Sequence, residues 1–402
     1  MRALALAAVA VGIGGIVNAA QAADRQDFTQ IERGHYLTDA GDCYSCHTQF
    51  GGKPFAGGRA IPTPFGTLLG ANITPDVDTG IGGWSDERFY RAMHDGVSGD
   101  EYLYPAMPYP YYTKVTREDA AAIRAYLATI EPVRNEVHSN QLRFPFDVRA
   151  SMKGWNSLFF GPGEWQNHAD KSADWNRGGY LVEGLGHCGA CHTPKNAMGG
   201  DENSQHLQGS VLQGWLAPRI AGESWSVDDI AEYLKSGTNA LATASGPMAE
   251  AVENSTSRLS LADLRAIAVY LKDQPAAAEK PPAALAADDP LMQAGKAIYA
   301  DECAACHTLD GSGIARLFPS LKGRASVQAA HADSLINVVL NGTRAAATPG
   351  APTAPAMPAF RWNLTDDQVA AVTTYIRNAW GNAAPAVSAD SVKAARQAMA
   401  QR

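Results

Sequence analysis

All the cysteines of this chain belong to one repeated pattern. The six cysteines occur as three C-x-x-C-H sequences, and no cysteine lies outside them. The three sequences consist of Cys43, Cys46 and His47; Cys188, Cys191 and His192; and Cys303, Cys306 and His307. The chemistry of this protein therefore has to use two thiols and an adjacent imidazole three times in one chain.

Three kinds of site use paired cysteines. A disulfide framework is typical of short, cysteine-dense secreted chains, whereas 402 residues can bury an ample apolar core without cross-links. A thioredoxin-like redox motif is a single C-x-x-C at a helix N-terminus beside a βαβ unit, and three copies in a strand-poor sequence do not fit it. In the third kind, both thiols form thioethers with a haem and the next histidine lies beneath the iron. The pattern predicts three covalently bound haem c groups, each with its motif histidine as an iron ligand.

The second axial ligand decides what such a haem does. An open iron site activates small molecules, whereas a second strong ligand confines the haem to carrying electrons. Each motif is followed, after a similar interval, by a methionine in a loop that contains proline, which stiffens an extended segment. These methionines are Met107 in "YPAMPYP", Met248 in "SGPMAEA" and Met357 in "APAMPAF". We expect His47 to pair with Met107, His192 with Met248, and His307 with Met357.

Other methionines and histidines are weaker candidates for iron ligands. Met93 follows Phe89 by one helical turn and is expected in the core. Met198 comes so soon after His192 that we expect it on the histidine side of the second haem. Three histidines outside the motifs have no counterpart in the other repeats and are expected to be structural or surface residues: His94, His187 and His331.

The elements around the motifs also recur, in the same order. A glycine and an aromatic residue precede each motif: Gly34 with Tyr36, Gly178 with Tyr180, and Gly295 with Tyr299. A helix closed by glycine follows each motif, ending at Gly96, Gly237 and Gly342. The helices before each motif and at the end of each repeat are expected to cross, because the glycine allows close backbone approach.

The last helix of each repeat shows the i, i+3, i+4 spacing of an apolar face. The apolar residues are Ile123, Tyr126 and Leu127; Ile267, Tyr270 and Leu271; and Val372, Tyr375 and Ile376. The helix starts are N-cap residues with capping-box partners: Thr116 with Asp119, Ser260 with Asp263, and Thr365 with Gln368.

Together these features predict an all-α fold of three tandem class I cytochrome c-like domains. The predicted boundaries are a signal peptide at 1–22, cytochrome c domains at 23–131, 174–274 and 289–384, a connecting arm at 132–173, a Pro/Ala linker at 275–288 and a C-terminal tail at 385–402. The arm carries four large aromatic residues, Trp155, Phe159, Phe160 and Trp165, and is therefore expected to pack over the first two domains.

The N-terminal residues are typical of a secretory signal. Arg2 precedes an apolar stretch at 3–17, and Ala20-Gln21-Ala22 provides a small-residue cleavage site before Ala23. The apolar stretch is too short for an uncleaved transmembrane anchor. In a Gram-negative bacterium the mature protein is expected in the periplasm, peripheral on the outer face of the cytoplasmic membrane. The net charge of −8 argues against a nucleic-acid partner.

Four further segments complete the pattern: "NITPDVDTGIGGWSDERF" at 72–89, "YPAMPYPYY" at 104–112, "GYLVEGLGHCGACHTP" at 179–194 and "RNAWGNAAPAVS" at 377–388. With them the whole mature chain resembles the trihaem cytochrome c subunit of membrane-bound bacterial dehydrogenases. These dehydrogenases include quinoprotein alcohol dehydrogenases and flavin-dependent gluconate, sorbitol, fructose and glucose dehydrogenases. Similar subunits serve molybdenum hydroxylases acting on aldehydes or nicotinate.

The resemblance implies an electron-transfer subunit without substrate chemistry of its own. Its electron donor would be a catalytic dehydrogenase subunit (quinoprotein, flavoprotein or molybdoprotein), and its acceptor ubiquinone or a terminal oxidase. The alternatives are a peroxidase-like multihaem enzyme, which requires an open iron site, and a disulfide exchange protein, which requires free thiols. The C-terminal segment has only a weak apolar face, formed by Val392, Ala395 and Met399, so membrane attachment through partner subunits stays open.

Overall fold

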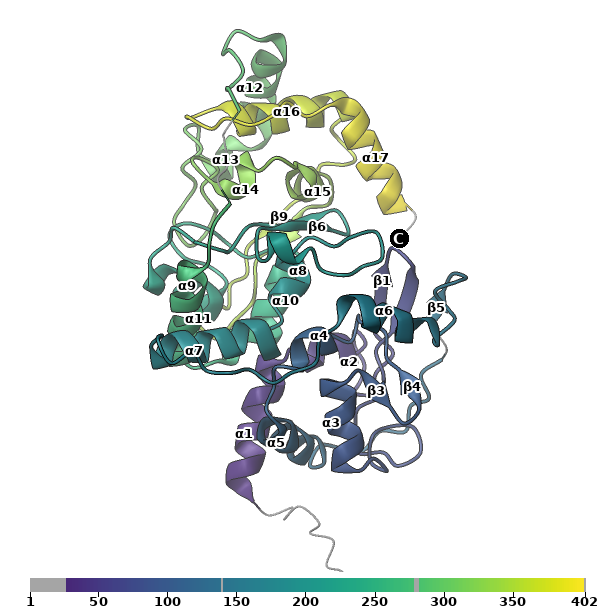
Figure 1. Ribbon diagram of the computed structural model, residues 1–402. Helices are drawn as coiled ribbons and strands as arrows, with labels where there is room; N and C mark the ends of the chain where they lie inside the picture. Colours follow the sequence, from purple (N-terminus) through teal and green to yellow (C-terminus); the bar gives the residue numbers. More distant parts are fainter. Residues whose placement is uncertain (1–26, 139, 278–281, 401–402) are drawn as a thin grey trace, which may run out of the picture.

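The computed structural model describes residues 27–138, 140–277 and 282–400 (Figure 1). The predicted signal peptide lies outside the described residues, as do residues 278–281 of the predicted Pro/Ala linker. We refer to residues 27–131 as the first unit, 132–173 as the arm, 174–274 as the second unit and 289–384 as the third unit. Figure 1 shows the first and third units at opposite ends of the molecule, with the second unit beside them.

Short helices and hairpins alternate in all three units. The first unit contains α1 (Phe28–Ala40), α2 (Cys43–His47), β1 (Ala60–Thr63), β2 (Gly66–Leu69), α3 (Asp86–His94), β3 (Val97–Ser98), β4 (Glu101–Tyr102), α4 (Tyr109–Tyr112) and α5 (Arg117–Leu127). The arm contains β5 (Gln141–Leu142) and α6 (Ser151–Phe159). The second unit contains α7 (Ala173–Tyr180), the π-helical segment η1 (Leu181–Leu185), α8 (Gly189–His192), η2 (Asn203–Gln205), β6 (Ser210–Leu212), β7 (Trp215–Ala217), α9 (Val227–Ser236), α10 (Pro247–Asn254), η3 (Thr256–Arg258) and α11 (Leu261–Asp273). The third unit contains α12 (Pro290–Glu302), α13 (Ala304–His307), α14 (Ala325–Gln328), α15 (Asp333–Asn341), β8 (Thr343–Arg344), β9 (Ala356–Met357) and α16 (Asp366–Asn378), and α17 (Ala389–Ala400) follows it.

The predicted helix crossing is present in each unit. A Cβ atom added to Gly34 of α1 would lie 1.9 Å from the carbonyl oxygen of Ala122 in α5. The corresponding distance is 2.0 Å from Gly178 to the Ala266 oxygen, and 2.2 Å from Gly295 to the Ala371 oxygen. A real Cβ atom cannot approach an oxygen so closely, so only glycine fits at these crossings. The helices closed by Gly96, Gly237 and Gly342 are also confirmed, since each glycine has a positive φ, at 65°, 76° and 67°.

The last helix of each unit has the predicted N-cap. The side chains of Thr116, Ser260 and Thr365 each accept a hydrogen bond from the backbone N–H three residues later. Among these three last helices, the full capping box forms only in α16, where the Thr365 N–H donates to Gln368 Oε1 at 2.9 Å. In the first two units the capping-box prediction is wrong. There the N-cap N–H donates instead to a tyrosine hydroxyl of the other unit.

The prediction of an all-α fold is wrong. The described residues include β1, β2 and β5 in one antiparallel sheet, and three two-stranded hairpins formed by β3–β4, β6–β7 and β8–β9. The strands are only two to four residues long, which is too short for an alternating pattern to stand out in a sequence. They shape the loops between the helices.

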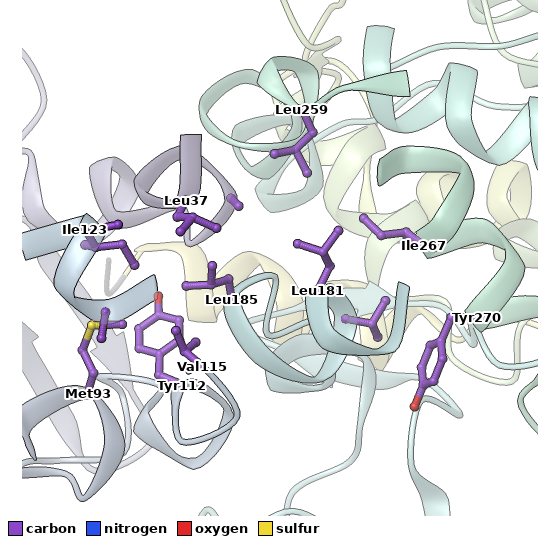
Figure 2. Packing of buried hydrophobic residues seen from close by; sticks show 14 of the residues in the cluster. Leu37, Met93, Tyr112, Val115, Ile123, Leu181, Leu185, Leu259, Ile267 and Tyr270 are labelled. Carbon is purple, nitrogen blue, oxygen red and sulfur yellow. The ribbon is translucent and has the colours of Figure 1, made fainter. Parts of the chain in front are cut away.

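The prediction of three tandem class I cytochrome c-like domains is also wrong, because the first two units share one core. A continuous apolar cluster joins Leu37 of α1 to Leu181 and Leu185 of η1 and Ile267 of α11 (Figure 2). The third unit has apolar clusters of its own, one around Leu340 and another around Tyr299 and Val372. A domain is expected to have its own core. The first two units do not meet this condition, whereas the third does.

The arm packs against both of the first two units, as predicted. Trp155 of α6 is buried, and its Nε1 donates to the carbonyl oxygen of Met198 in the second unit at 2.9 Å. The neighbouring Asn156 accepts a hydrogen bond from the Tyr109 hydroxyl of the first unit at 2.6 Å. Strand β5 pairs with β2 and so extends the sheet of the first unit. The arm is therefore an ordered connection rather than a free linker.

The C-terminal helix α17 lies on the third unit. Val392 is fully buried in the cluster that contains Leu340, and Arg396 donates to Asp366 Oδ1 at 2.8 Å and to the Leu364 oxygen at 2.9 Å. Val392 and Ala395 of the weak apolar face thus pack against protein. Within the residues that the structure describes, no helix is both long enough and apolar enough to cross a membrane.

Candidate haem sites

Each C-x-x-C-H motif forms a short helix, namely α2, α8 and α13. None of the six cysteines forms a disulfide. Burial raises the pKa of Cys43, Cys46, Cys188 and Cys303 to about 12. This shift is opposite to the lowered pKa of the reactive thiol in a thioredoxin-like motif. These four thiols therefore fit thioether attachment better than thiol–disulfide exchange.

The three motif histidines are held in the same way. The Nδ1 atoms lie 2.7 Å from the oxygen of Ala71 for His47, 2.7 Å from the oxygen of Pro218 for His192, and 3.0 Å from the oxygen of Pro319 for His307. A carbonyl oxygen only accepts hydrogen bonds, so each Nδ1 carries the proton and each Nε2 keeps a lone pair.

The electrostatics of these imidazoles match that arrangement. Burial lowers the pKa of all three motif histidines, although the hydrogen bond to the backbone carbonyl opposes the shift. Each imidazole is therefore neutral at neutral pH and oriented by a backbone oxygen, as in metal-binding histidines generally.

The first candidate site is gathered around one large cavity. The cavity has a volume of about 2740 Å³ and extends along all three units; its lining includes Cys43, Cys46, His47 and Met107, together with Cys191 of the second motif and Met93. The methionine loop is fixed because the Tyr109 N–H donates to the Met107 oxygen at 2.7 Å and the Tyr109 ring is completely buried. The structure therefore brings both predicted axial residues of the first site to the same cavity.

The other two methionines lie at the edges of apolar clusters. Met248 occupies the first turn of α10, directly after Pro247, and packs with Ala244 and Val252. Met357 lies on β9 and packs against the cluster that contains Leu340. Both side chains are partly buried. The pairings of His192 with Met248 and of His307 with Met357 stay predictions.

One residue near the third motif was not singled out in the sequence. The Nε atom of Arg324 is buried and has no hydrogen-bond partner among the described residues. Buried donors are almost always paired, and a guanidinium pairs best with a carboxylate. Arg324 follows closely after Pro319, whose oxygen holds His307. Its free donor suits a haem propionate. No feature of the sequence separates Arg324 from the other basic residues.

Met93 and the three histidines lie where the sequence predicted, whereas the position of Met198 relative to a haem stays a prediction. Met93 is buried in the shared core of the first two units. His94 stacks on Tyr90, and His187 packs edge-on against Tyr112. His331 is exposed beside Asp333. Met198 is half exposed, and its backbone oxygen holds Trp155.

Comparison with known proteins gives consistent matches. Residues 292–380 match the family model described as cytochrome c. The gluconate 2-dehydrogenase cytochrome c subunit of Pantoea cypripedii is 39% identical, over 97% of this chain and 94% of that protein. The alcohol dehydrogenase (quinone) cytochrome c subunit of Gluconobacter oxydans is 36% identical, over 97% of this chain and 87% of that protein. This chain belongs to the family of dehydrogenase cytochrome c subunits.

Membership in this family makes the chain an electron-transfer subunit with covalently bound haem c. A further relative, a nicotinate dehydrogenase subunit of Pseudomonas putida, is 42% identical over 91% of this chain, but the match spans only 32% of that protein. The chain thus corresponds to about a third of that relative. The cytochrome c model matches the third unit alone, which agrees with the finding that only this unit has a core of its own.

Proposed function

We propose that this chain is a trihaem c-type cytochrome that carries electrons from a catalytic dehydrogenase subunit to ubiquinone or a terminal oxidase. The observation that carries the proposal is the common arrangement of His47, His192 and His307. All three imidazoles are neutral, and each is held through Nδ1 by a backbone oxygen. A chain with one haem would need this arrangement only once.

The residues of each site have distinct roles in this proposal. When bound, haem c supplies an iron that alternates between the ferric and ferrous states. Cys43 and Cys46, Cys188 and Cys191, and Cys303 and Cys306 hold the three haems through thioethers. The backbone oxygens that accept from Nδ1 orient the rings and raise the electron density at Nε2. Met107, Met248 and Met357 supply the second axial ligands, and a thioether favours the ferrous state. Arg324 pairs with a propionate of the third haem.

The proposed haem-binding segments are 23–131, 174–274 and 289–384, joined by the arm and by the Pro/Ala linker. Residues 1–22 direct export, so the protein works in the periplasm, peripheral on the outer face of the cytoplasmic membrane. Haem is attached to such motifs outside the cytoplasm, which supports this location. The docking of α17 on the third unit favours membrane attachment through partner subunits.

The names of the relatives indicate that the electron donor is a dehydrogenase. Their names specify dehydrogenases of gluconate, of nicotinate and of alcohols with quinone. The proposed partner is accordingly a quinoprotein, flavoprotein or molybdoprotein that oxidises an alcohol, a sugar, a sugar acid or an aldehyde. The cytochrome itself oxidises no substrate.

The haem count is the first test of this proposal. Mass spectrometry after acid-acetone extraction should show three haems retained by the exported protein. Replacing Cys188 and Cys191 with alanine should remove one haem, whereas the control Gly154→Ala, on an exposed part of α6 with free space around it, should keep all three. Retention of a single haem would contradict the trihaem proposal.

The second test concerns function. The purified cytochrome should be reduced by a matching dehydrogenase with its substrate, and reoxidised by membranes with a ubiquinone analogue. Substrate oxidation by the cytochrome alone, with contamination excluded, would instead favour a multihaem enzyme.

A further inference from the structure

Two tyrosines tie the first and second units together in a reciprocal way. The Tyr36 hydroxyl of the first unit donates to Asp263 Oδ2 of the second unit at 2.5 Å and accepts from the Ser260 N–H at 3.1 Å. The Tyr180 hydroxyl of the second unit does the same in the first unit. It donates to Asp119 Oδ2 at 2.5 Å and accepts from the Thr116 N–H at 3.3 Å.

Each tyrosine completes the N-cap of the other unit's last helix. In a capping box, the side chain at the third helical position accepts from the N-cap N–H. Here the hydroxyl of the neighbouring unit's tyrosine takes this place. Without it, the Thr116 N–H would lose its partner at a partly buried contact, which carries a free-energy cost, whereas water can replace the partner of the exposed Ser260 N–H.

The carboxylates at the centre of both contacts are held by arginines of their own units. Arg33 Nε donates to Asp119 Oδ1 at 2.6 Å, and Asp119 is only 2% exposed. Arg177 makes two hydrogen bonds to Asp263, at 2.8 and 2.7 Å. Hydrogen bonds from a hydroxyl to an ionised carboxylate are short and strong. The two Tyr–Asp contacts are therefore expected to be firm links.

The backbone loops that lead into the first two haem motifs also touch each other. The Tyr112 hydroxyl donates to the Gly41 oxygen at 2.7 Å, and the Tyr112 ring packs edge-on against His187 at 5.6 Å between ring centroids. A Cβ atom added to Gly41 would lie 3.3 Å from Leu185 of η1. Gly41 comes just before Cys43, and His187 directly precedes Cys188.

The tyrosines lie on the helices that lead into these loops. Tyr36 is on α1, which runs into the first motif, and Tyr180 ends α7, which η1 connects to the second motif. A shift of either helix would therefore be carried into a haem motif over a short stretch of chain.

We infer that Tyr36 and Tyr180 are positioning residues that set the separation and orientation of the first two haem sites, so that these sites exchange electrons as one pair. This inference rests on the proposed function, since it requires a haem at both motifs. In the exchange one electron leaves a ferrous iron and enters a ferric iron, and no bond or proton moves.

Within the described part of the chain, the third unit has no such Tyr–Asp contact with another unit and therefore provides a natural control. Counting from the crossing glycines, Ala294 and Ala297 occupy the places of the arginine and the tyrosine, and Gln368 occupies the place of the aspartate. Tyr299, which the sequence grouped with Tyr36 and Tyr180, points into its own unit and donates to the Thr308 oxygen at 2.7 Å. Removing this hydroxyl should not affect the first two sites.

The test compares Tyr36→Phe, Tyr180→Phe and the double variant with Tyr299→Phe, all in the full haem-loaded protein. Circular dichroism in the Soret region reports coupling between neighbouring haems. Flash photolysis reports the rate of electron exchange between them. Each single variant should weaken the coupling, and the double variant should lose most of it and slow the exchange, while Tyr299→Phe leaves both unchanged.

Hydrogen exchange gives the size of the structural effect. Loss of one charge-assisted hydrogen bond should raise the opening of the contact between the units about ten-fold at amides of α1 and α7. If the double variant fails to fold, Asp263→Gln replaces it. This variant rebuilds the self-contained cap of the third unit in α11 and removes the carboxylate that Tyr36 uses.

The outcomes distinguish this inference from the proposed function. Fewer than three haems in the unaltered protein would overturn the proposed function. Three retained haems with the same Soret coupling and the same exchange rate in the double variant as in Tyr299→Phe would overturn the positioning role alone.

Discussion

The first two units and the third unit solve the same local problem in different ways. Every helix begins with backbone N–H groups that need acceptors. The third unit supplies the acceptor itself, through Gln368. The first two units instead exchange acceptors, because each contributes a tyrosine to the other. The need of each N-cap N–H for an acceptor is thus met by a hydrogen bond that links the two units.

The cores show the same contrast. Leu37, Leu181 and Leu185 belong to one apolar cluster that runs from the first unit into the second (Figure 2). The third unit meets the second through smaller contacts. The Ala347 N–H donates to Glu253 Oε1 at 2.6 Å, the Leu216 N–H donates to Ser334 Oγ of α15 at 2.6 Å, and Ala346 joins a small apolar cluster with Ala244, Ala249 and Val252. The first two units should therefore unfold together, whereas the third should unfold as a separate body.

The largest effect is expected from filling a crossing glycine. Gly34→Ala puts a Cβ atom against the Ala122 oxygen, and Gly295→Ala does the same at Ala371. Each should destabilise its own body by about 3 kcal/mol or more, because backbone at a helix crossing cannot move aside. In calorimetry Gly34→Ala should lower the shared transition of the first two units, and Gly295→Ala only the transition of the third.

The matched control is Gly154→Ala on α6, where nothing lies close to the new atom. It should leave both transitions in place. If Gly34→Ala shifted a transition of the first unit alone and left the second unit's melting unchanged, the joint body would not exist.

A smaller but sharper comparison uses two leucines that are both completely buried. Leu185 lies in the shared core, and Leu340 lies in the core of the third unit. Replacement of either by alanine should cost about 2–5 kcal/mol. Leu185→Ala should lower the joint transition and Leu340→Ala the other one, as measured by denaturant unfolding. An equal response of both transitions to Leu340→Ala would contradict the separation.

Acid should weaken the contact at Asp263, which has no titrating counterpart at the same place in the third unit. Burial alone would raise the pKa of Asp263, but the hydrogen bonds from Arg177 and Tyr36 outweigh it and hold the pKa below 3.8. A lowered pKa adds stability above 3.8, and this stability is lost as the pH falls through the folded-state value. Gln368, at the same place in the third unit, does not titrate.

The measurement is the free energy of unfolding against pH for the unaltered protein and for Asp263→Asn. The difference between them should be constant near neutral pH and shrink below about pH 4. A difference that grew in acid would contradict the assigned shift.

The smallest effect concerns the contact between the second and third units. Arg344 lies 2.9 Å from Glu253, but its side chain is 56% exposed. Arg344→Ala should therefore change the stability of either body by less than about 1 kcal/mol, and salt should weaken what effect there is. The matched control is Arg134→Ala. Arg134 of the arm pairs with Asp78 of the first unit, and both side chains are more exposed than those of Arg344 and Glu253. An effect as large as that of Leu185→Ala would show that the third unit is not loosely joined.

The three short motif helices could be predicted from the sequence, because the C-x-x-C-H order recurs in each repeat, whereas the haem attachment that this order indicates stays a prediction. The helix crossings at Gly34, Gly178 and Gly295 could be predicted for a similar reason, since the spacing repeats within each unit. The short hairpins could not, because strands of two to four residues leave no periodic signal.

The link between the first two units was hidden for another reason. Asp119 and Asp263 follow their N-caps at capping-box spacing, so within each unit they predict a local hydrogen bond. Their true acceptor role becomes visible only once Tyr180 and Tyr36 are placed across the contact. The sequence also aligned Tyr299 with these tyrosines, although it lies two positions further from its glycine and packs against Tyr375 and Trp380.

The exchanged caps have a consequence for how the chain acquires its structure. Synthesis proceeds from the N-terminus, and domains generally fold as soon as they are complete. Helix α5 is made early, yet the hydroxyl that its Thr116 N–H needs belongs to a residue 64 positions later. The first unit therefore cannot complete its structure until the segment that contains Tyr180 has been synthesised. The third unit has its own apolar clusters and its own capping box, so a deletion or fusion at its boundary should leave a module that folds alone, whereas cutting between the first two would leave both incomplete.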